Sequence, residues 1–224
     1  MSRHFNLTLT CMSAMLALFL LPASTHAGES EHPSFDCRKA ASVAEKTICA
    51  NAALSRQDFQ LGSMWRTLRD DFSDSAQLPQ MKADQKAWMG RRDKCGADAT
   101  CMGKLYQERL SVLNGADAAH RFSGIYDVKD IGGFAVYPLG NRYLVNIQTA
   151  DPQEGKWTCQ LTGEAEASGD DLKISVQGTV FQARLRDPET LIVPEADSSS
   201  AAAAKFCGLN GTFAFTYLRI RSNP

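Results

Sequence analysis

The sequence is poor in the residues that many enzymes use for proton transfer and nucleophilic attack. It has four histidines in 224 residues, and two of them, His4 and His26, fall within the first 27 positions. His32 and His120 lie in expected connecting segments, so histidine-assisted serine or cysteine hydrolysis is poorly supported. The sequence also lacks a glycine-rich phosphate loop and a metal-binding helix motif. Carboxylates are numerous, but no pair stands out as the acid and base of a glycosidase.

The sequence has no large excess of one charge and few long apolar runs. Its 24 basic side chains are matched by 25 acidic ones. A nearly neutral protein lacks the excess of positive charge that attracts nucleic acids or anionic membranes. The one long apolar run, at residues 12–21, is too short to span a bilayer as a mature helix. We therefore expect neither a nucleic-acid partner nor a membrane span in the mature protein.

The first 27 residues have the organisation of a secretory signal peptide. Arg3 lies in a short basic region, residues 12–21 form the apolar core, and residues 25–27 resemble a small-residue cleavage site. An uncleaved anchor would need a longer run with flanking stop-transfer charges. The small residues of a lipidation box are missing before Cys11. We therefore expect cleavage before Gly28 and a soluble, periplasmic or secreted product.

Cysteine usage also indicates an oxidising compartment. Loss of Cys11 with the signal would leave six of the seven cysteines, and an even number in an exported chain favours disulfides. We predict three bonds: Cys37–Cys49, Cys95–Cys101 and Cys159–Cys207. A competing arrangement joins Cys49 to Cys101. A zinc site is disfavoured because the sequence has no C-x-x-C spacing and few histidines.

Two apolar stripes of helical period follow each other in the first half of the chain. They cover residues 54–72 and 78–95, and the polar connection of residues 73–77 is short enough to make the helices antiparallel neighbours. Folding the stripes together brings Asp58 opposite Arg92. Because a charge in a seam is costly unless it is paired, we predict a structural ion pair there. The same register pairs Leu61 with Trp88, Trp65 with Gln85 and Leu68 with Met81.

Capping signals predict the neighbouring helices. Ser42 followed by Glu45 has the spacing of a capping box and indicates a short first helix. Asn51 can cap the long helix that follows. Thr100 can cap a last helix that ends near residue 114. The first domain is therefore expected to be a small bundle of three or four helices.

The residues that decorate this bundle form a specific pattern of cysteine, tryptophan and arginine. The pattern comprises Asp36-Cys37-Arg38-Lys39-Ala40, Glu45-Lys46-Thr47-Ile48-Cys49-Ala50, Gln85-Lys86-Ala87-Trp88, Arg91-Arg92-Asp93-Lys94-Cys95, Cys101, Tyr106 and Arg109. It resembles the N-terminal domain of the LprI-like family of bacterial lysozyme inhibitors over residues 35–114. The resemblance implies a protein that binds a lysozyme and blocks it. It does not extend to residues 122–224.

The period of the apolar residues falls to two after Phe122. Alternation recurs at residues 143–147, 157–161, 172–176, 181–185 and 213–217. Turn signals such as Gly140-Asn141 separate these segments. About eight short strands at this spacing predict an antiparallel barrel or sandwich.

The expected fold class is α+β with two domains. A disulfide-pinned helical domain covers residues 28–114, after a signal peptide at residues 1–27. A linker at residues 115–121 leads to the β domain at residues 122–224.

A short motif at the start of the β domain has two interpretations. Ser123-Gly124-Ile125-Tyr126 resembles the loops by which some periplasmic lysozyme inhibitors enter the lysozyme cleft. It also begins the first expected strand, where Phe-x-Gly-x-Tyr is an ordinary start of a small β domain. We favour the ordinary interpretation and keep Ser123, Gly124 and Tyr126 as candidate contact residues.

Three functions are compatible with these patterns. The first is an exported inhibitor that occludes a lysozyme or related muramidase, with no catalytic residues, cofactor or metal of its own. The second is an envelope binding or immunity module with another partner. The third is a carboxylate-dependent hydrolase of the cell wall. The resemblance favours the first.

Overall fold

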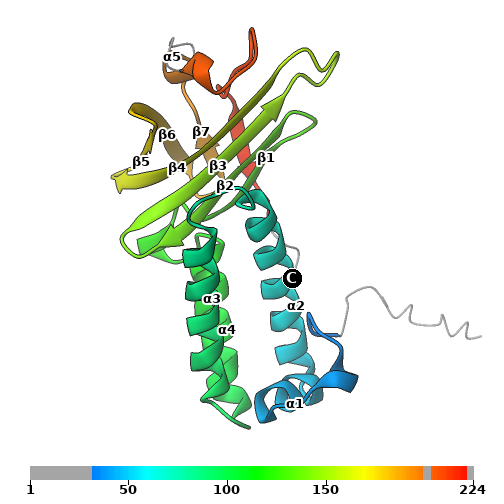
Figure 1. Cartoon of the computed structure of the whole chain (residues 1–224). Coiled ribbons are helices and arrows are strands. Elements are labelled where there is room, and N and C mark those ends of the chain that lie inside the picture. Colours follow the sequence, from blue (N-terminus) through cyan, green and yellow to red (C-terminus); the bar gives the residue numbers. More distant parts are fainter. Residues whose placement is uncertain (1–31, 199–202, 221–224) are drawn as a thin grey trace, which may run out of the picture.

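A computed structural model describes residues 32–198 and 203–220. It shows a bundle of four α-helices followed by a closed antiparallel barrel of eight strands (Figure 1). The expected α+β class is thereby confirmed, and the structure decides for a barrel over a sandwich. The predicted signal peptide lies outside the described residues.

The helical domain begins with a short 3-10 helix and continues in four α-helices. Their bounds are η1 Cys37–Lys39, α1 Val43–Ala50, α2 Ala52–Asp71, α3 Leu78–Asp93 and α4 Ala99–Leu113. Ser42 and Glu45 form both hydrogen bonds of the predicted capping box. The Asn51 side chain caps α2 by accepting from the Leu54 N–H.

The cap of α4 differs from the prediction. The Asp98 carboxylate, not the Thr100 hydroxyl, caps the helix by accepting the backbone N–H groups of Thr100 and Cys101. A carboxylate at this position satisfies two otherwise free donors and also interacts favourably with the helix dipole. The helix therefore begins at Ala99, before the residue that we expected to cap it.

The barrel strands are joined mostly by short turns. Their bounds are β1 Gly124–Val128, β2 Gly132–Leu139, β3 Arg142–Ala150, β4 Thr158–Ser168, β5 Asp171–Val176, β6 Thr179–Asp187, β7 Thr190–Ile192 and β8 Thr216–Arg219. Each strand pairs with the next, and β8 pairs with β1 to close the barrel. The short helix α5 Glu195–Ser198 lies between β7 and β8, at the barrel end remote from the bundle (Figure 1).

The interior of the barrel is filled by side chains. Its core includes the fully buried aromatic residues Tyr126, Phe134, Phe181, Phe213 and Tyr217. Phe134 and Tyr217 meet edge to face, with ring centroids 5.5 Å apart. Inward-pointing residues alternate with outward ones along each strand, as a small closed barrel requires. The barrel is a packed body that holds its surface loops in place.

The bundle packs against the outer face of β2 and β3. Ala135, Tyr137 and Leu139 of β2, with Leu144 of β3, belong to the same apolar core as the helices. The Trp65 ring on α2 meets the Tyr137 ring edge to face at 6.1 Å between centroids. Strand β2 is therefore buried on both faces. Figure 1 shows the bundle standing against the barrel with α1 at its far end.

The segment between the domains is held by a buried arginine of β8. Arg219 donates hydrogen bonds to the carbonyl oxygens of Asn114, Arg121 and Ser123. The predicted linker at residues 115–121 includes a 3-10 helix, η2 Ala118–His120. Gly115 has φ +73°, and a Cβ there would lie 2.5 Å from Arg219 Nη1. The linker is therefore a structured joint between the two domains.

Three disulfides link the described cysteines. The bonds are Cys37–Cys49, Cys95–Cys101 and Cys159–Cys207. The first two tie the ends of neighbouring helices, and the third ties the segment before β8 to the start of β4. Within the described ranges, no helix has the length and apolar character needed to cross a membrane.

Candidate partner-binding groove

Asp58 and Arg92 lie in a closed polar network inside the bundle. Arg92 Nη1 is 3.6 Å from Asp58 Oδ1. The Tyr106 hydroxyl of α4 donates to the same carboxylate at 2.6 Å, and Ser34 donates to it through its backbone N–H at 2.7 Å and its hydroxyl at 2.6 Å. Burial and the nearby Asp58 raise the pKa of Tyr106, so Tyr106 stays a donor. This network holds the N-terminal arm and three helices together and offers no surface to a partner.

A second network joins the bundle to the barrel. Arg109 Nη2 on α4 donates to Asp84 Oδ2 at 2.7 Å, to Gln85 Oε1 at 3.0 Å and to the Tyr137 hydroxyl at 2.9 Å. Tyr137 donates in turn to Asp84 at 2.6 Å. The pattern of buried polar residues on α3 and α4 marks this joint, but no local pattern marks Tyr137 of β2 as their hydrogen-bonding partner.

The motif at the start of β1 does not form an exposed loop. Ser123 and Tyr126 are fully buried, and the Tyr126 hydroxyl donates to the Phe122 carbonyl oxygen at 2.9 Å. Gly124 has φ +145° and lies against the Arg219 guanidinium. Of the three candidate contact residues, only Ser123 and Tyr126 have side chains, and neither side chain reaches the surface. The structure therefore supports the ordinary interpretation of this motif.

A polar pocket lies beside the linker, where a hydrolase site would have access to solvent. It has a volume of about 520 Å³, and His120 and Arg142 are among its lining residues. His120 Nδ1 lies 2.8 Å from Asp117 Oδ1. Glu166 is the one carboxylate among the described lining residues, so the lining lacks the carboxylate pair that the hydrolase hypothesis requires. Within the described residues, no group of histidine, cysteine and acidic side chains is arranged to hold a metal ion. The geometry gives the hydrolase hypothesis no support.

An exposed loop that follows Cys207 lies at the end of the barrel remote from the bundle (Figure 1). The Cys159–Cys207 disulfide precedes it, and Leu209 at its tip is 87% exposed. A shallow hollow of about 980 Å³ adjoins the loop and is lined in part by Pro194 and Phe215. This loop is a rigidly anchored protrusion, but a single exposed leucine is common on soluble proteins.

A groove runs where the end of α2 meets the outer face of β1 to β4. Its volume is about 590 Å³, and residues of both domains line it. Thr67 and Asp71 come from α2, whereas Asp127 comes from β1. Gly133 and Ala135 of β2 lie along the groove with minimal side chains. The groove thus results from the docking of the two domains.

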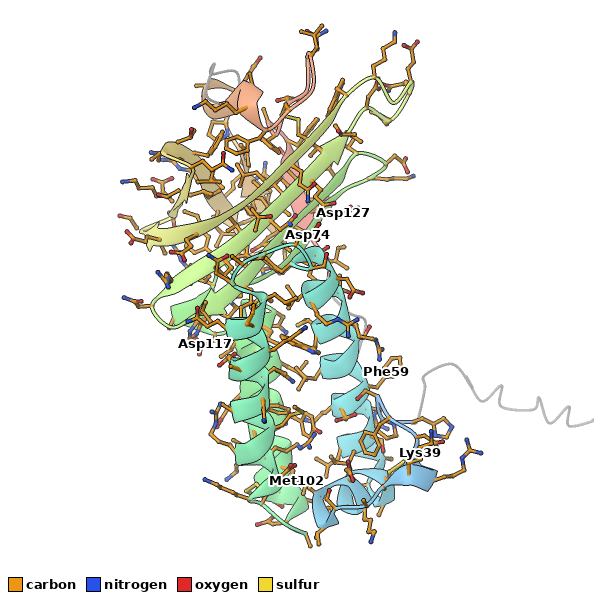
Figure 2. The ribbon with its side chains drawn as sticks, viewed as in Figure 1. Lys39, Phe59, Asp74, Met102, Asp117 and Asp127 are labelled. Atoms are coloured by element: carbon orange, nitrogen blue, oxygen red, sulfur yellow. A yellow bond between two sulfur atoms is a disulfide. The ribbon has the colours of Figure 1, made fainter. Side chains whose placement is uncertain are left out.

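Asp71 is the most perturbed carboxyl group of this groove. Its side chain is half-buried, and burial, followed by the neighbouring charge of Asp70, raises the pKa of Asp71 to about 6. Asn146 binds the backbone carbonyl of Asp71 at 2.6 Å, but no described residue forms an ion pair with its carboxylate. Figure 2 shows Asp127 and Asp74 at the junction where the end of α2 approaches the barrel.

The helical domain has relatives among known proteins. Residues 37–113 match a family model described as "Lysozyme inhibitor LprI", which confirms the resemblance over this domain. Proteins named "Lipoprotein LprI" from Mycobacterium bovis and Mycobacterium tuberculosis are 30% identical to this chain over 89 residues. The aligned part is 38% of this chain and 43% of each relative, so the chain spans less than half of their length. No solved structure matches the chain.

Proposed function

We propose that this protein is exported to the periplasm, where it binds a lysozyme or related muramidase and blocks it. The observation that carries the proposal is the match of residues 37–113 to the lysozyme-inhibitor family model. Inhibition by occlusion requires no catalytic group in the inhibitor. This agrees with the polar networks of Asp58 and Arg109, whose hydrogen bonds join structural elements of the protein.

The architecture is suited to binding without turnover. Disulfides pin the bundle, and a shared apolar core and the Arg219 hydrogen bonds fix it to the barrel. A preorganised surface loses less conformational freedom on binding, so more of the contact energy appears as affinity. The three bonds also suit the oxidising compartment that the signal peptide predicts.

The charge distribution supports a basic partner. Residues 115–220 carry thirteen acidic and nine basic side chains. An acidic surface accelerates encounter with a basic enzyme and disfavours acidic competitors. This surface belongs mainly to the barrel, which lies outside the family match.

A second candidate function is an envelope binding or immunity module with a different protein partner. It is favoured by one observation, namely that the match covers only the helical domain and leaves the whole barrel unassigned. The anchored Leu209 loop would then be the natural contact of the barrel. This candidate predicts a partner in periplasmic extracts but no effect on lysozymes.

The test is titration of the full mature chain against chicken-type, goose-type and invertebrate-type lysozymes. We expect stoichiometric loss of wall-degrading activity for at least one enzyme, and no wall clearance by the protein alone. Reduced and alkylated protein serves as the unfolded control. Full activity of all three enzymes at a large molar excess would reject the proposal. Wall clearance by the chain itself would instead support the hydrolase.

A further inference from the structure

We propose that the groove between α2 and strands β1 to β4 receives a lysine or arginine side chain of the muramidase, with Asp71 and Asp127 as counter-charges. The identity of the partner rests on the proposed function. The preference for a cation rests on the groove itself.

Among the described residues, no cation compensates the negative charge of the groove. Asp71 and Asp127 both line it, and no described lining residue is lysine, arginine or histidine. Neither carboxylate forms an ion pair with a described residue, whereas Asp70 is paired with Arg69 at 2.7 Å. A half-buried carboxylate without a partner is unfavourable, as the raised pKa of Asp71 shows. A cation from outside would relieve this cost.

The end of α2 adds to the negative potential. Asp71 is the last residue of a helix that begins at Ala52. The carbonyl end of a helix carries a partial negative charge, so it favours cations and disfavours a carboxylate. A carboxylate at this terminus stabilises neither the helix nor the fold. The role of the Asp71 carboxylate is therefore to bind the cation of the partner.

The walls of the groove fit a long, partly apolar side chain. Gly133 and Ala135 leave space along β2, and the amides of Gln148 and Gln160 are further lining groups that can accept hydrogen bonds. Ile220 lines the groove, and it is 52% exposed. Lysine and arginine cover apolar surface with their methylene stems while the charged head reaches polar groups. A small inorganic cation would leave this apolar wall uncovered.

The proposal implies a pH dependence with a definite sign. Asp71 must be ionised to bind a cation, and its pKa is about 6. Binding should therefore strengthen as the pH rises from about 5 to about 7. Asp70 is the charged group that acts on Asp71. Asp127 on β1 is the other charged residue among the described lining residues, and those of β2, β3 and β4 are neutral.

The experiment compares Asp71→Asn and Asp127→Asn with a matched control, Asp74→Asn. Asp74 is an exposed carboxylate of the α2–α3 connection at the same junction but does not line the groove. Each variant removes one negative charge from the full mature chain with almost no change in shape. Inhibition of a lysozyme that the wild type blocks is measured at pH 5 and pH 7. Independently, trilysine is titrated while the backbone amides of Gly133 and Gln148 are followed by NMR.

We expect each groove variant to weaken inhibition by about tenfold at pH 7, the effect of a lost charge contact at an interface. Asp74→Asn should leave inhibition unchanged. Trilysine should shift the groove amides in the wild type and in Asp74→Asn, and not in the double groove variant. Equal inhibition by all variants would overturn the proposal while leaving the proposed function standing.

The trilysine titration distinguishes a failure of the proposed function from a failure of the cation site. If wild-type protein inhibits no lysozyme, the proposed function fails, and groove-confined shifts that depend on Asp71 and Asp127 still support a cation site. Shifts that are absent, or that persist in the double variant, overturn the site. A wild-type dimer that the double variant dissociates would assign the groove to a second copy and overturn the proposed occupant.

Discussion

At the scale of single residues, Asp58 accepts hydrogen bonds from Tyr106 and from two donors of Ser34 in the interior of the bundle. Arg92 lies 3.6 Å away and is also bound to Asp93 at 2.7 Å. Arg92 therefore keeps a partner if Asp58 is lost, whereas the Tyr106 hydroxyl keeps only Arg92. The cost of breaking the network thus depends on which member is removed.

We predict that Asp58→Ala destabilises the protein more than the double change Asp58→Leu with Arg92→Leu. The single variant leaves buried polar groups without their acceptor, and removing one partner of a buried pair typically costs about 3–5 kcal/mol. Both variants leave Tyr106 and Ser34 without Asp58. The double variant differs because it also removes the buried guanidinium and fills the site with apolar side chains. Thermal unfolding of both proteins tests this. Equal melting temperatures would contradict the prediction, because they would show that removing the Arg92 guanidinium gives no relief once Asp58 is lost.

A second residue-scale prediction concerns Asp71. Its pKa of about 6 in the folded protein is raised above the ordinary value of 3.8. The folded state therefore disfavours the charged form, so this group lowers stability as the pH rises through that interval. Asp71→Asn should raise stability at pH 7.5 by about 1 kcal/mol, since solvent screens a half-buried group, and have little effect at pH 3.5.

Thermal unfolding at the two pH values measures this effect. A gain of that size corresponds to a rise of about 2–4 °C in Tm for a chain of this length. Asp74→Asn is the control and should show no such pH dependence. A loss of stability at pH 7.5 would show that the Asp71 carboxylate has a stabilising partner.

At the scale of elements, the disulfides close loops of very different length. The sequence separation is 48 for Cys159–Cys207 and 6 for Cys95–Cys101. Chain entropy assigns about 4 kcal/mol to the longer loop and about 2 kcal/mol to the shorter one. We therefore predict that replacing Cys159 and Cys207 by alanine lowers stability more than the same change at Cys95 and Cys101. Denaturant unfolding measures both losses.

A change confined to the loop distinguishes the two exposed surfaces. Cys159 both anchors the loop and lines the groove beside α2, whereas Leu209 does not line the groove, so Leu209→Ser alters the loop alone. Inhibition measured well below the melting temperature should therefore survive if the groove is the contact. Its loss in this variant alone would assign the contact to the loop.

The helices show what periodicity can predict. The heptad register placed Asp58 and Arg92 together, and local capping rules located the starts of α1 and α2, because these features depend on neighbours within a few residues. The register did not reveal that Tyr106 of α4 enters between the two charges. It also paired Trp65 with Gln85, whereas Trp65 contacts Tyr137 and Gln85 accepts from Arg109.

The barrel shows a similar limit. A period of two predicted the strands, but two-residue periodicity does not distinguish a barrel from a sandwich. Residues 134–139 are apolar in succession, which is typical of a strand buried on both faces. That run was the available signal for the docking of the bundle. The groove depends on this docking, so no local pattern could predict it.

At the scale of the whole molecule, the two domains share one interface core. Separation would expose Ala135, Tyr137, Leu139 and Leu144 on the barrel. It would also leave Arg109 without the Tyr137 hydroxyl and Asn114 without Arg219. Neither domain is therefore expected to behave as an independent module.

We predict that residues 28–116 and 119–224, produced separately in an oxidising compartment, are each less stable than the same domain in the intact chain. Burial of one large apolar side chain contributes roughly 1.5–3 kcal/mol, and the separated barrel loses the cover of Tyr137, Leu139 and Leu144. The exposed patch should make the barrel fragment self-associate. Leu139→Gln with Leu144→Gln should keep that fragment monomeric. Sedimentation and thermal unfolding of the fragments, alone and mixed, measure these effects.

If both fragments are monomeric, retain the stability of the intact chain and do not bind each other, the interface contributes nothing. The groove would then have no fixed shape, and the binding proposed for it would fail together with this prediction.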